Sequence, residues 1–207
     1  MIATLVLRFV VTACREREAG VAYLRRHIPK LEVVWDTTGD AMDTFIAACD
    51  LIGDSDGVIR LEDDICLTKR FVSKVLVVAD HRRDVIQFFS RSKADLTRGS
   101  RWNRVFSMNQ CFYLPPMMSG QIARFFRSAA WKPNRGWCPT GYDILMTHLF
   151  DSQGRRHWIS VPSLVEHANQ PSMISARSRF RQSRTFTDPE MRGFPADYGV
   201  AFLEKNQ

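Results

Sequence analysis

Strand-like and helix-like segments alternate through the first ninety residues, and this alternation constrains the fold more than any other feature of the sequence. Short runs rich in apolar and β-branched residues predict strands at Leu5–Thr12, Leu31–Trp35, Gly57–Leu61 and Val85–Phe89. Apolar residues at helical spacing predict helices between them, at Ala19–His27, Asp40–Cys49 and Lys69–Ala79. This alternation predicts an α/β fold in which helices cover a mainly parallel sheet.

The pattern after residue 90 is less regular. The polar and basic stretch Lys93–Asn103 predicts a surface loop. Further elements are predicted as a strand at Gln110–Leu114, helices at Met117–Arg127 and Tyr142–Phe150, and short strands at His157–Val161 and Leu164–Glu166. The sequence holds no internal repeat and no evident linker, so its 207 residues fit one domain followed by a tail.

Composition narrows the class of protein. The hydrophobic share of 45% and the charged share of 25% are ordinary for a soluble globular chain. No apolar run is long enough to span a bilayer, and Met1–Leu7 reads as a first strand rather than a signal peptide. The five cysteines are scattered and form no zinc-type pair, which predicts free thiols in a reducing cytoplasm.

The net charge of +7 is unevenly distributed along the chain. The segment 91–184 holds 15 Lys and Arg against 4 Asp and Glu, whereas the remainder has more acidic than basic residues. So basic a segment favours an anionic partner, of which nucleic acid is the first candidate. A solvated surface with ordinary counterions is the competing interpretation.

Three successive carboxylates, Glu62-Asp63-Asp64, follow the predicted strand Gly57–Leu61. Buried together without a counter-charge, they would repel one another and lose hydration, so a cation is expected beside them. Oxygen ligands suit Mg²⁺ or Mn²⁺, and strand ends are where open α/β sheets place ligands. The alternative is an acidic turn in solvent.

The order of these and neighbouring motifs resembles that of the GT-A nucleotide-sugar glycosyltransferases. The motifs are Thr12–Arg17, Trp35–Asp40, Leu61–Asp64, Gly141–Asp143 and Val161–His167. The small size and basic second half are similar to the phage enzymes associated with TET-like proteins, which glycosylate hydroxymethylated bases in DNA. The resemblance implies a Rossmann-like GT-A domain over 1–176, with a nucleotide-sugar half (1–90) and an acceptor half (91–176), and then a basic tail or lid over 177–207.

For the metal and the donor, the resemblance implies residue roles that the chemistry supports. Asp64 would be a direct metal ligand, Glu62 would act through a coordinated water, and Asp63 would reach the ribose or the donor sugar. His167 would complete the metal shell and favour Mn²⁺ over Mg²⁺, because imidazole is a poor ligand for Mg²⁺; a structural histidine is the alternative. The remaining donor contacts, to a nucleotide diphosphate sugar with UDP-sugar preferred, would come from Thr12, Cys14, Arg15 and Asp36.

Asp143 is the candidate general base. An inverting hexosyl- or N-acetylhexosaminyl-transferase must remove the proton of the acceptor hydroxyl, and a carboxylate within hydrogen-bond reach does this. Asp143 would otherwise be a first-turn helix residue favoured by the helix dipole. A retaining mechanism would remove the need for this base.

Arginines interleaved with aromatic residues predict the acceptor surface. Such a surface can stack an extruded base and hold phosphates. The residues selected for contact with DNA are Trp102, Arg104, Trp137, Arg177, Arg179 and Arg181. Core tryptophans and a solubilising tail are the plain alternative, and closure of the tail over the donor pyrophosphate is a third.

These predictions lead to a transferase with 5-hydroxymethylcytosine in DNA as the preferred acceptor, working without a membrane in the cytoplasm, or in the host cytoplasm if a phage encodes it. Two further functions stay open. One is transfer to a saccharide or glycan, and the other is non-catalytic nucleic-acid binding, which leaves the three carboxylates unexplained. A metal-dependent nuclease or nucleotidyltransferase would need further carboxylates and a lysine that the sequence does not place.

Overall fold

The computed structural model describes residues 7–54, 57–80, 84–128, 141–168, 170 and 181–198. Its main sheet has seven strands in the order β2-β1-β3-β7-β5-β8-β6. These strands are β1 (Leu7–Ala13), β2 (Glu32–Trp35), β3 (Gly57–Glu62), β5 (Ile86–Gln87), β6 (Arg101–Asn103), β7 (Cys111–Leu114) and β8 (His157–Ile159). A second sheet pairs β4 (Ile65–Leu67) with β9 (Val165–His167). The α/β class is therefore as predicted.

The sheet is mixed rather than mainly parallel, which corrects the sequence-based expectation. β1 runs parallel to β2 and β3, and β5 runs parallel to β8. β7 is antiparallel to both of its neighbours, β3 and β5, and β6 is antiparallel to β8. Neighbouring strands run parallel when a helix crosses over between them. Among the described residues, no helix lies between β6 and β7, so the expectation does not apply to β7.

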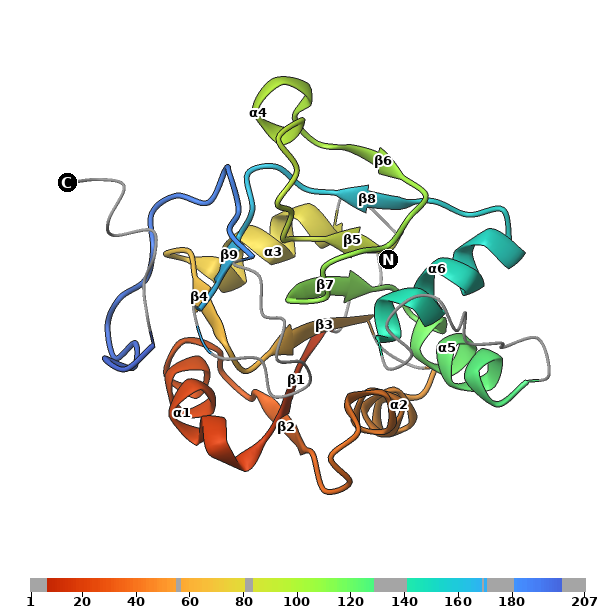
Figure 1. The fold of residues 1–207 in the computed structure, drawn as a ribbon, viewed down its shortest axis with the longest axis horizontal. Coiled ribbons are helices and arrows are strands. Elements are labelled where there is room, and N and C mark those ends of the chain that lie inside the picture. Colours follow the sequence, from red (N-terminus) through yellow and green to blue (C-terminus); the bar gives the residue numbers. More distant parts are fainter. Residues whose placement is uncertain are drawn as a thin grey trace, which may run out of the picture.

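Helices cover both faces of the sheet (Figure 1). They are α1 (Glu18–His27), α2 (Ala41–Ile52), α3 (Phe71–Asp80), α4 (Asp95–Arg98), α5 (Met118–Arg127) and α6 (Tyr142–Ser152), with a short 3₁₀ turn, η1, at Arg15–Arg17. Side chains of β3 alternate between two cores, as the period of two in a strand requires. Ile59 and Leu61 pack with α1 and α3, while Val58 packs with α2, α5 and α6.

Several local predictions are confirmed and others need correction. Asp40 caps α2, accepting from the backbone N–H of Met42 at 2.7 Å. The strand expected at Val85–Phe89 is confined to Ile86–Gln87, and the loop expected at Lys93–Asn103 contains α4 and β6. These elements form because Asp95 is buried and pairs with Arg101, a contact that the local sequence does not reveal.

The C-terminal segment 181–198 packs against the domain. The backbone N–H of Glu190 donates to Leu67 of β4, and the Tyr23 hydroxyl of α1 donates to the carbonyl of Glu190. Phe194 packs edge-on against Tyr23. The described part of the predicted tail is therefore built into the fold beside α1 and β4 (Figure 1).

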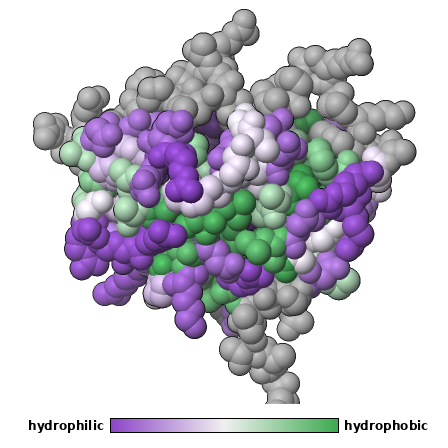
Figure 2. All heavy atoms as spheres, turned by 90° about the horizontal axis from the view of Figure 1, so that it is seen from below, coloured by the Kyte–Doolittle hydropathy of each residue, from purple (hydrophilic) through white to green (hydrophobic). Residues whose placement is uncertain are grey.

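The surface seen from below has a patch of hydrophobic residues bordered by hydrophilic ones (Figure 2). Cys14, Cys49, Cys66 and Cys111 are free thiols, as predicted for these four positions. Within the described ranges, no helix is both long and apolar enough to cross a bilayer.

Candidate metal and nucleotide-sugar site

The three carboxylates lie where β3 ends and turns into β4. Glu62 is the last residue of β3, and Asp63 and Asp64 form the turn. Because β4 pairs with β9 in the register Ile65↔His167, the histidine is brought next to this turn. One ligand atom each from Glu62, Asp64 and His167 lie within 4.8 Å of one another. Two segments about one hundred residues apart thus supply one possible metal site.

Asp64 is the centre of this cluster. Its Oδ2 accepts from Nη1 of Arg17 at 2.5 Å and lies 3.4 Å from Nε2 of His167. Its Oδ1 is buried and has no hydrogen-bond partner among the described residues. A buried carboxylate oxygen without a partner is costly. Asp64 therefore has a buried oxygen available to a cation.

Asp63, which was expected to reach the donor, contacts the chain that follows β1. Its Oδ2 accepts from the backbone N–H of Cys14 at 2.9 Å, and its Oδ1 accepts from Arg17 at 3.0 Å. Burial raises the pKa of Asp63, the charge of Asp64 raises it further, and Arg17 lowers it. Both oxygens are thus engaged with the chain that follows β1, and Asp63 ties that chain to the metal cluster.

Glu62 is held by two neutral donors. The Tyr142 hydroxyl donates to Oε1 at 3.0 Å, and Nε2 of Gln110 donates to Oε2 at 3.2 Å. Burial raises the pKa of Glu62 to about 7, and the negative charge of Asp64 adds to this effect. Glu62 offers one carboxylate oxygen within 4.8 Å of ligand atoms of Asp64 and His167.

Asp143 and Arg181 lie close to the cluster. Asp143 is in the first turn of α6, next to the tyrosine that binds Glu62, and burial raises its pKa. The positive charge of Arg181 lowers the pKa values of Glu62, Asp143 and His167. For His167, burial is the larger cause of its lowered pKa. One guanidinium that acts on all three groups faces the site from the C-terminal segment.

The residues predicted to hold the nucleotide surround the end of β1. Thr12 accepts from Nη2 of Arg60 at 3.4 Å, and burial raises the pKa of the Cys14 thiol to about 11. The guanidinium of Arg15 stacks 4.3 Å from the ring centre of Trp35. Asp36 accepts from the backbone of Thr38 and Gly39, and these bonds lower its pKa against the opposing effect of burial. These side chains and the metal cluster lie together at the carboxyl ends of the parallel strands β1, β2 and β3.

Trp102, the described aromatic residue of the predicted acceptor surface, does not lie there. Trp102 is 40% exposed and belongs to the edge strand β6, and Arg104 directly follows that strand. β6 is four strand spacings from β3, about 19 Å across the sheet. Trp137, Arg177 and Arg179 lie outside the described residues.

Several site residues were not singled out from the sequence. Tyr142 and Gln110 bind Glu62. The sequence indicates Arg17, with Arg15, only as a phosphate contact, and does not predict its bridge to Asp63 and Asp64. Arg60 is almost fully buried on β3, on the same face as Glu62, and burial lowers its pKa. The sequence could have indicated Arg60, because residues two positions apart in a strand point to the same face. Arg60 in an apolar strand must therefore lie on the face that carries Glu62.

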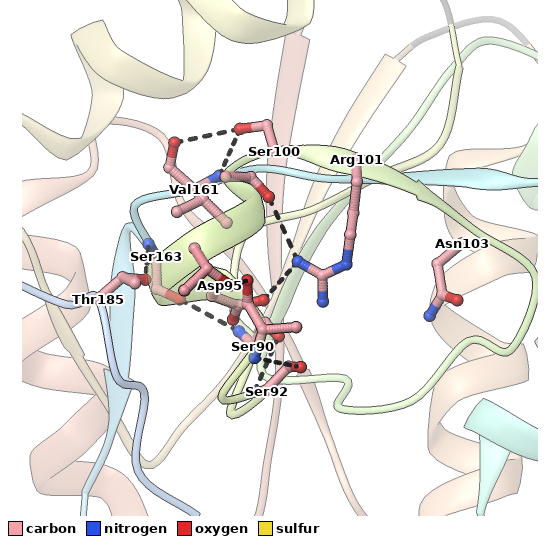
Figure 3. A network of polar contacts seen from close by, with 12 residues as sticks. Ser90, Ser92, Asp95, Ser100, Arg101, Asn103, Val161, Ser163 and Thr185 are labelled. Carbon is pink, nitrogen blue, oxygen red and sulfur yellow. Dashed lines mark hydrogen bonds and ion pairs between the residues drawn. The ribbon is translucent and has the colours of Figure 1, made fainter.

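A network of hydroxyls and backbone groups fastens the segment that carries Arg181 (Figure 3). The backbone N–H of Ser163 donates to Thr185 at 3.1 Å, and the Ser163 hydroxyl accepts from the backbone of Ser90. Glu166, next to His167, accepts from the backbone N–H of Ser183 at 3.0 Å. The same side of the fold therefore positions both His167 and Arg181.

No protein-family description and no curated protein matches the chain. Among solved structures, it is similar to A197 from STIV, with a TM-score of 0.49 and 11% sequence identity over 87% of this chain and 96% of that one. The functional conclusion consequently depends on the site's own residues.

Proposed function

We propose that the protein is a metal-dependent glycosyltransferase that moves a sugar from a nucleotide diphosphate sugar, preferably a UDP-sugar, to a hydroxyl group. The observation that carries this proposal is the convergence of Glu62, Asp64 and His167 at the end of β3. Arg17 and Arg181 add positive charge beside this cluster, and Asp143 adds a half-buried acid.

The residues present fit a divalent cation. Two carboxylates and an imidazole form a mixed oxygen and nitrogen set, which favours Mn²⁺ over Mg²⁺. The unpartnered Oδ1 of Asp64 is a buried acceptor that a cation would satisfy. When bound, such an ion would stabilise the negative charge that develops on the departing diphosphate.

The chain's own cations support binding of the diphosphate. Arg17 and Arg181 can donate charge-assisted hydrogen bonds to phosphate oxygens. Arg17 is held by Asp63 and Asp64, so it is oriented before a donor arrives. The proposed contacts of the nucleoside remain Thr12, Cys14, Arg15 and Asp36. Asp63 supports them by accepting the hydrogen bond of the Cys14 backbone N–H.

Asp143 is proposed as the base of an inverting reaction. Burial raises its pKa, which makes the ionised carboxylate a better proton acceptor. It would take the proton of the acceptor hydroxyl while that oxygen attacks the anomeric carbon. The nearby Arg181 opposes the effect of burial on this pKa.

5-Hydroxymethylcytosine in DNA is the acceptor we favour. The basic balance of residues 91–184 supports an anionic polymer. The distance of about 19 Å between β3 and β6 corresponds to about five or six base pairs, so Trp102 and Arg104 would contact DNA away from the reacting base. A saccharide acceptor is the alternative within the same reaction class.

Mass spectrometry of hydroxymethylcytosine DNA, incubated with the protein, Mn²⁺ and a panel of nucleotide sugars, tests the proposal. A mass increase of one sugar per modified base is expected, and none is expected with unmodified DNA. Transfer only to oligosaccharides in a parallel panel would keep the transferase and replace the acceptor. DNA binding without any transfer, metal binding or donor binding would favour a non-catalytic nucleic-acid-binding protein.

A further inference from the structure

A basic cleft lies between α1, the start of α3 and the C-terminal segment. Its volume is about 310 Å³. The side chains that matter for its chemistry are Arg26, His27, Arg70, Ser73, Glu190 and Arg192. None of them belongs to the proposed metal and donor site.

Three guanidinium groups line this cleft without carboxylate partners. Within the described ranges, no ion pair joins Arg26, Arg70 or Arg192 to an acid. Glu190 is the one acidic residue among those lining the cleft, and its Oε1 accepts from a backbone N–H at 3.2 Å. Three like charges around a concave surface repel one another unless an anion lies between them.

The walls of the cleft are fixed to one another. Nε2 of His27, at the end of α1, makes a hydrogen bond with the carbonyl oxygen of Arg192 at 2.8 Å. The Arg26 guanidinium lies so close over Gly193 that an added Cβ would stand 2.3 Å from Nη1. These contacts fix the backbone of Arg192 against the end of α1 and place the Arg26 guanidinium over Gly193. The two walls are therefore joined before any ligand binds, which lowers the entropic cost of binding.

The first turn of α3 adds neutral donors to this charge. Arg70 adopts a left-handed backbone conformation (φ 57°) immediately before α3, and Ser73 follows in the first turn. The free N–H groups at a helix start favour anions. Guanidinium groups, a hydroxyl and backbone N–H groups are together the donors that bind phosphate oxygens.

The cleft is separate from the carboxylate cluster. Arg17 lies at the start of α1 and Arg26 near its end, which places their backbones about 14 Å apart along the helix. We propose that this cleft binds a phosphoryl group, as phosphate, diphosphate or a small phosphate ester. Its volume is at the small end for ligand pockets, and this favours a compact ligand over a whole nucleotide sugar.

Calorimetric titration of inorganic pyrophosphate into the metal-free full-length protein tests this inference. The double variant Arg70→Gln/Arg192→Gln should weaken the affinity by about a hundredfold, because two charge-assisted bonds are lost. The matched control is Arg155→Gln/Arg156→Gln, which removes two exposed charges from the loop before β8 and should leave the affinity unchanged. Arg26→Gln alone should weaken binding about tenfold and covers the case in which the double variant misfolds.

A parallel titration with a single-stranded oligonucleotide separates two sources of the phosphoryl group. Loss of pyrophosphate affinity in the double variant assigns the cleft to a small ligand, and loss confined to the oligonucleotide assigns it to a nucleic-acid backbone. Equal affinity of the wild type and both cleft variants for both anions overturns the inference. So does loss of pyrophosphate binding in Arg181→Gln with no loss in the cleft variants, because the anion would then bind at the carboxylate site. Since no metal or sugar donor is present, failure here leaves the proposed transferase untouched.

Discussion

Glu62 and Asp143 are both half-buried acids, but their neighbours differ. Glu62 lies beside Asp64 and accepts hydrogen bonds from Tyr142 and Gln110, so it is fixed as part of the anionic cluster. Among the described residues, the Asp143 carboxylate accepts only local backbone bonds, from Ile144 and from its own N–H. Its carboxylate therefore has the freedom to contact an acceptor that Glu62 lacks.

Replacement of Asp143 separates catalysis from binding. Asp143→Asn keeps the size of the side chain but removes the proton acceptor, so we expect turnover to fall by about a hundredfold or more. Donor binding, followed by titration of the nucleotide sugar with Mn²⁺, should stay within about threefold of the wild type. The control Asp151→Asn, on an exposed position of the same helix, should leave both unchanged. Full transfer by Asp143→Asn would contradict the assignment.

A second prediction concerns His157 and the pH dependence of folding stability. It is completely buried between Phe106 and Phe150, and burial, followed by the charge of Arg101, lowers its pKa to about 4. The unfolded chain takes up this proton near pH 6.5, whereas the folded protein does not. Protonation therefore favours unfolding, and stability contributed by the neutral ring is complete above pH 6.5 and declines as the pH falls towards 4.

Urea unfolding at two pH values measures this effect. From pH 7.5 to pH 5, the wild type should lose about 2 kcal/mol more than His157→Phe, in which no proton can bind. His148→Gln, on the half-buried side of α6, should retain the pH dependence of the wild type. An identical loss in the wild type and His157→Phe would show that His157 is not the group responsible.

At the scale of elements, α1 approaches the acidic turn through a glycine. A Cβ added to Gly20 would stand 2.1 Å from the carbonyl oxygen of Asp63, and this oxygen belongs to rigid backbone. Gly120 occupies the equivalent third position of α5, but a Cβ there would meet the end of the flexible Asp54 side chain. These two glycines form a matched pair for substitution.

Gly20→Ala should destabilise the protein by about 1–3 kcal/mol, even though alanine favours helix, because the turn must move. It should also weaken Mn²⁺ binding, since the turn carries Asp64. Gly120→Ala should change stability by less than about 1 kcal/mol and leave Mn²⁺ binding intact. Denaturant unfolding and metal titration of both variants check this, and equal behaviour of the two would contradict the close packing of α1 on the turn.

The N-terminal elements could be predicted because each has a local cause. Asp40 caps α2 with its own side chain, and the alternating residues of β3 determine its two faces. The direction of β7 and the existence of β6 could not be predicted in this way. β6 depends on its pairing with β8 and on the ion pair of Arg101 with Asp95, which are tertiary contacts.

The same division applies to the candidate site. The carboxylates and His167 could be selected because chemistry and strand ends mark them. The bridge from Arg17 to Asp63 and Asp64 could not, since it joins positions almost fifty residues apart. The placement of Arg181 depends on hydrogen bonds around Ser183, which no sequence pattern indicates.

At the scale of the whole molecule, the carboxylate cluster and the arginine-lined cleft occupy different regions. The carboxylate cluster lies at the carboxyl end of β3, where the positive charges of Arg17 and Arg181 offset its negative charge. The basic cleft lies beyond the other end of α1. A divalent ion at the cluster would complete the charge balance at the first of these regions and would prepare it for a diphosphate.

Manganese titration of the wild type and Asp64→Asn tests the central claim, that this cluster binds a divalent cation. We predict one Mn²⁺ per wild-type chain and a loss of affinity of about a hundredfold or more in Asp64→Asn and His167→Ala, because each removes a direct ligand. Asp54→Asn, which changes an exposed acid paired with Arg124, should bind Mn²⁺ like the wild type. No Mn²⁺ binding by the wild type, or equal binding by Asp64→Asn, would contradict the account.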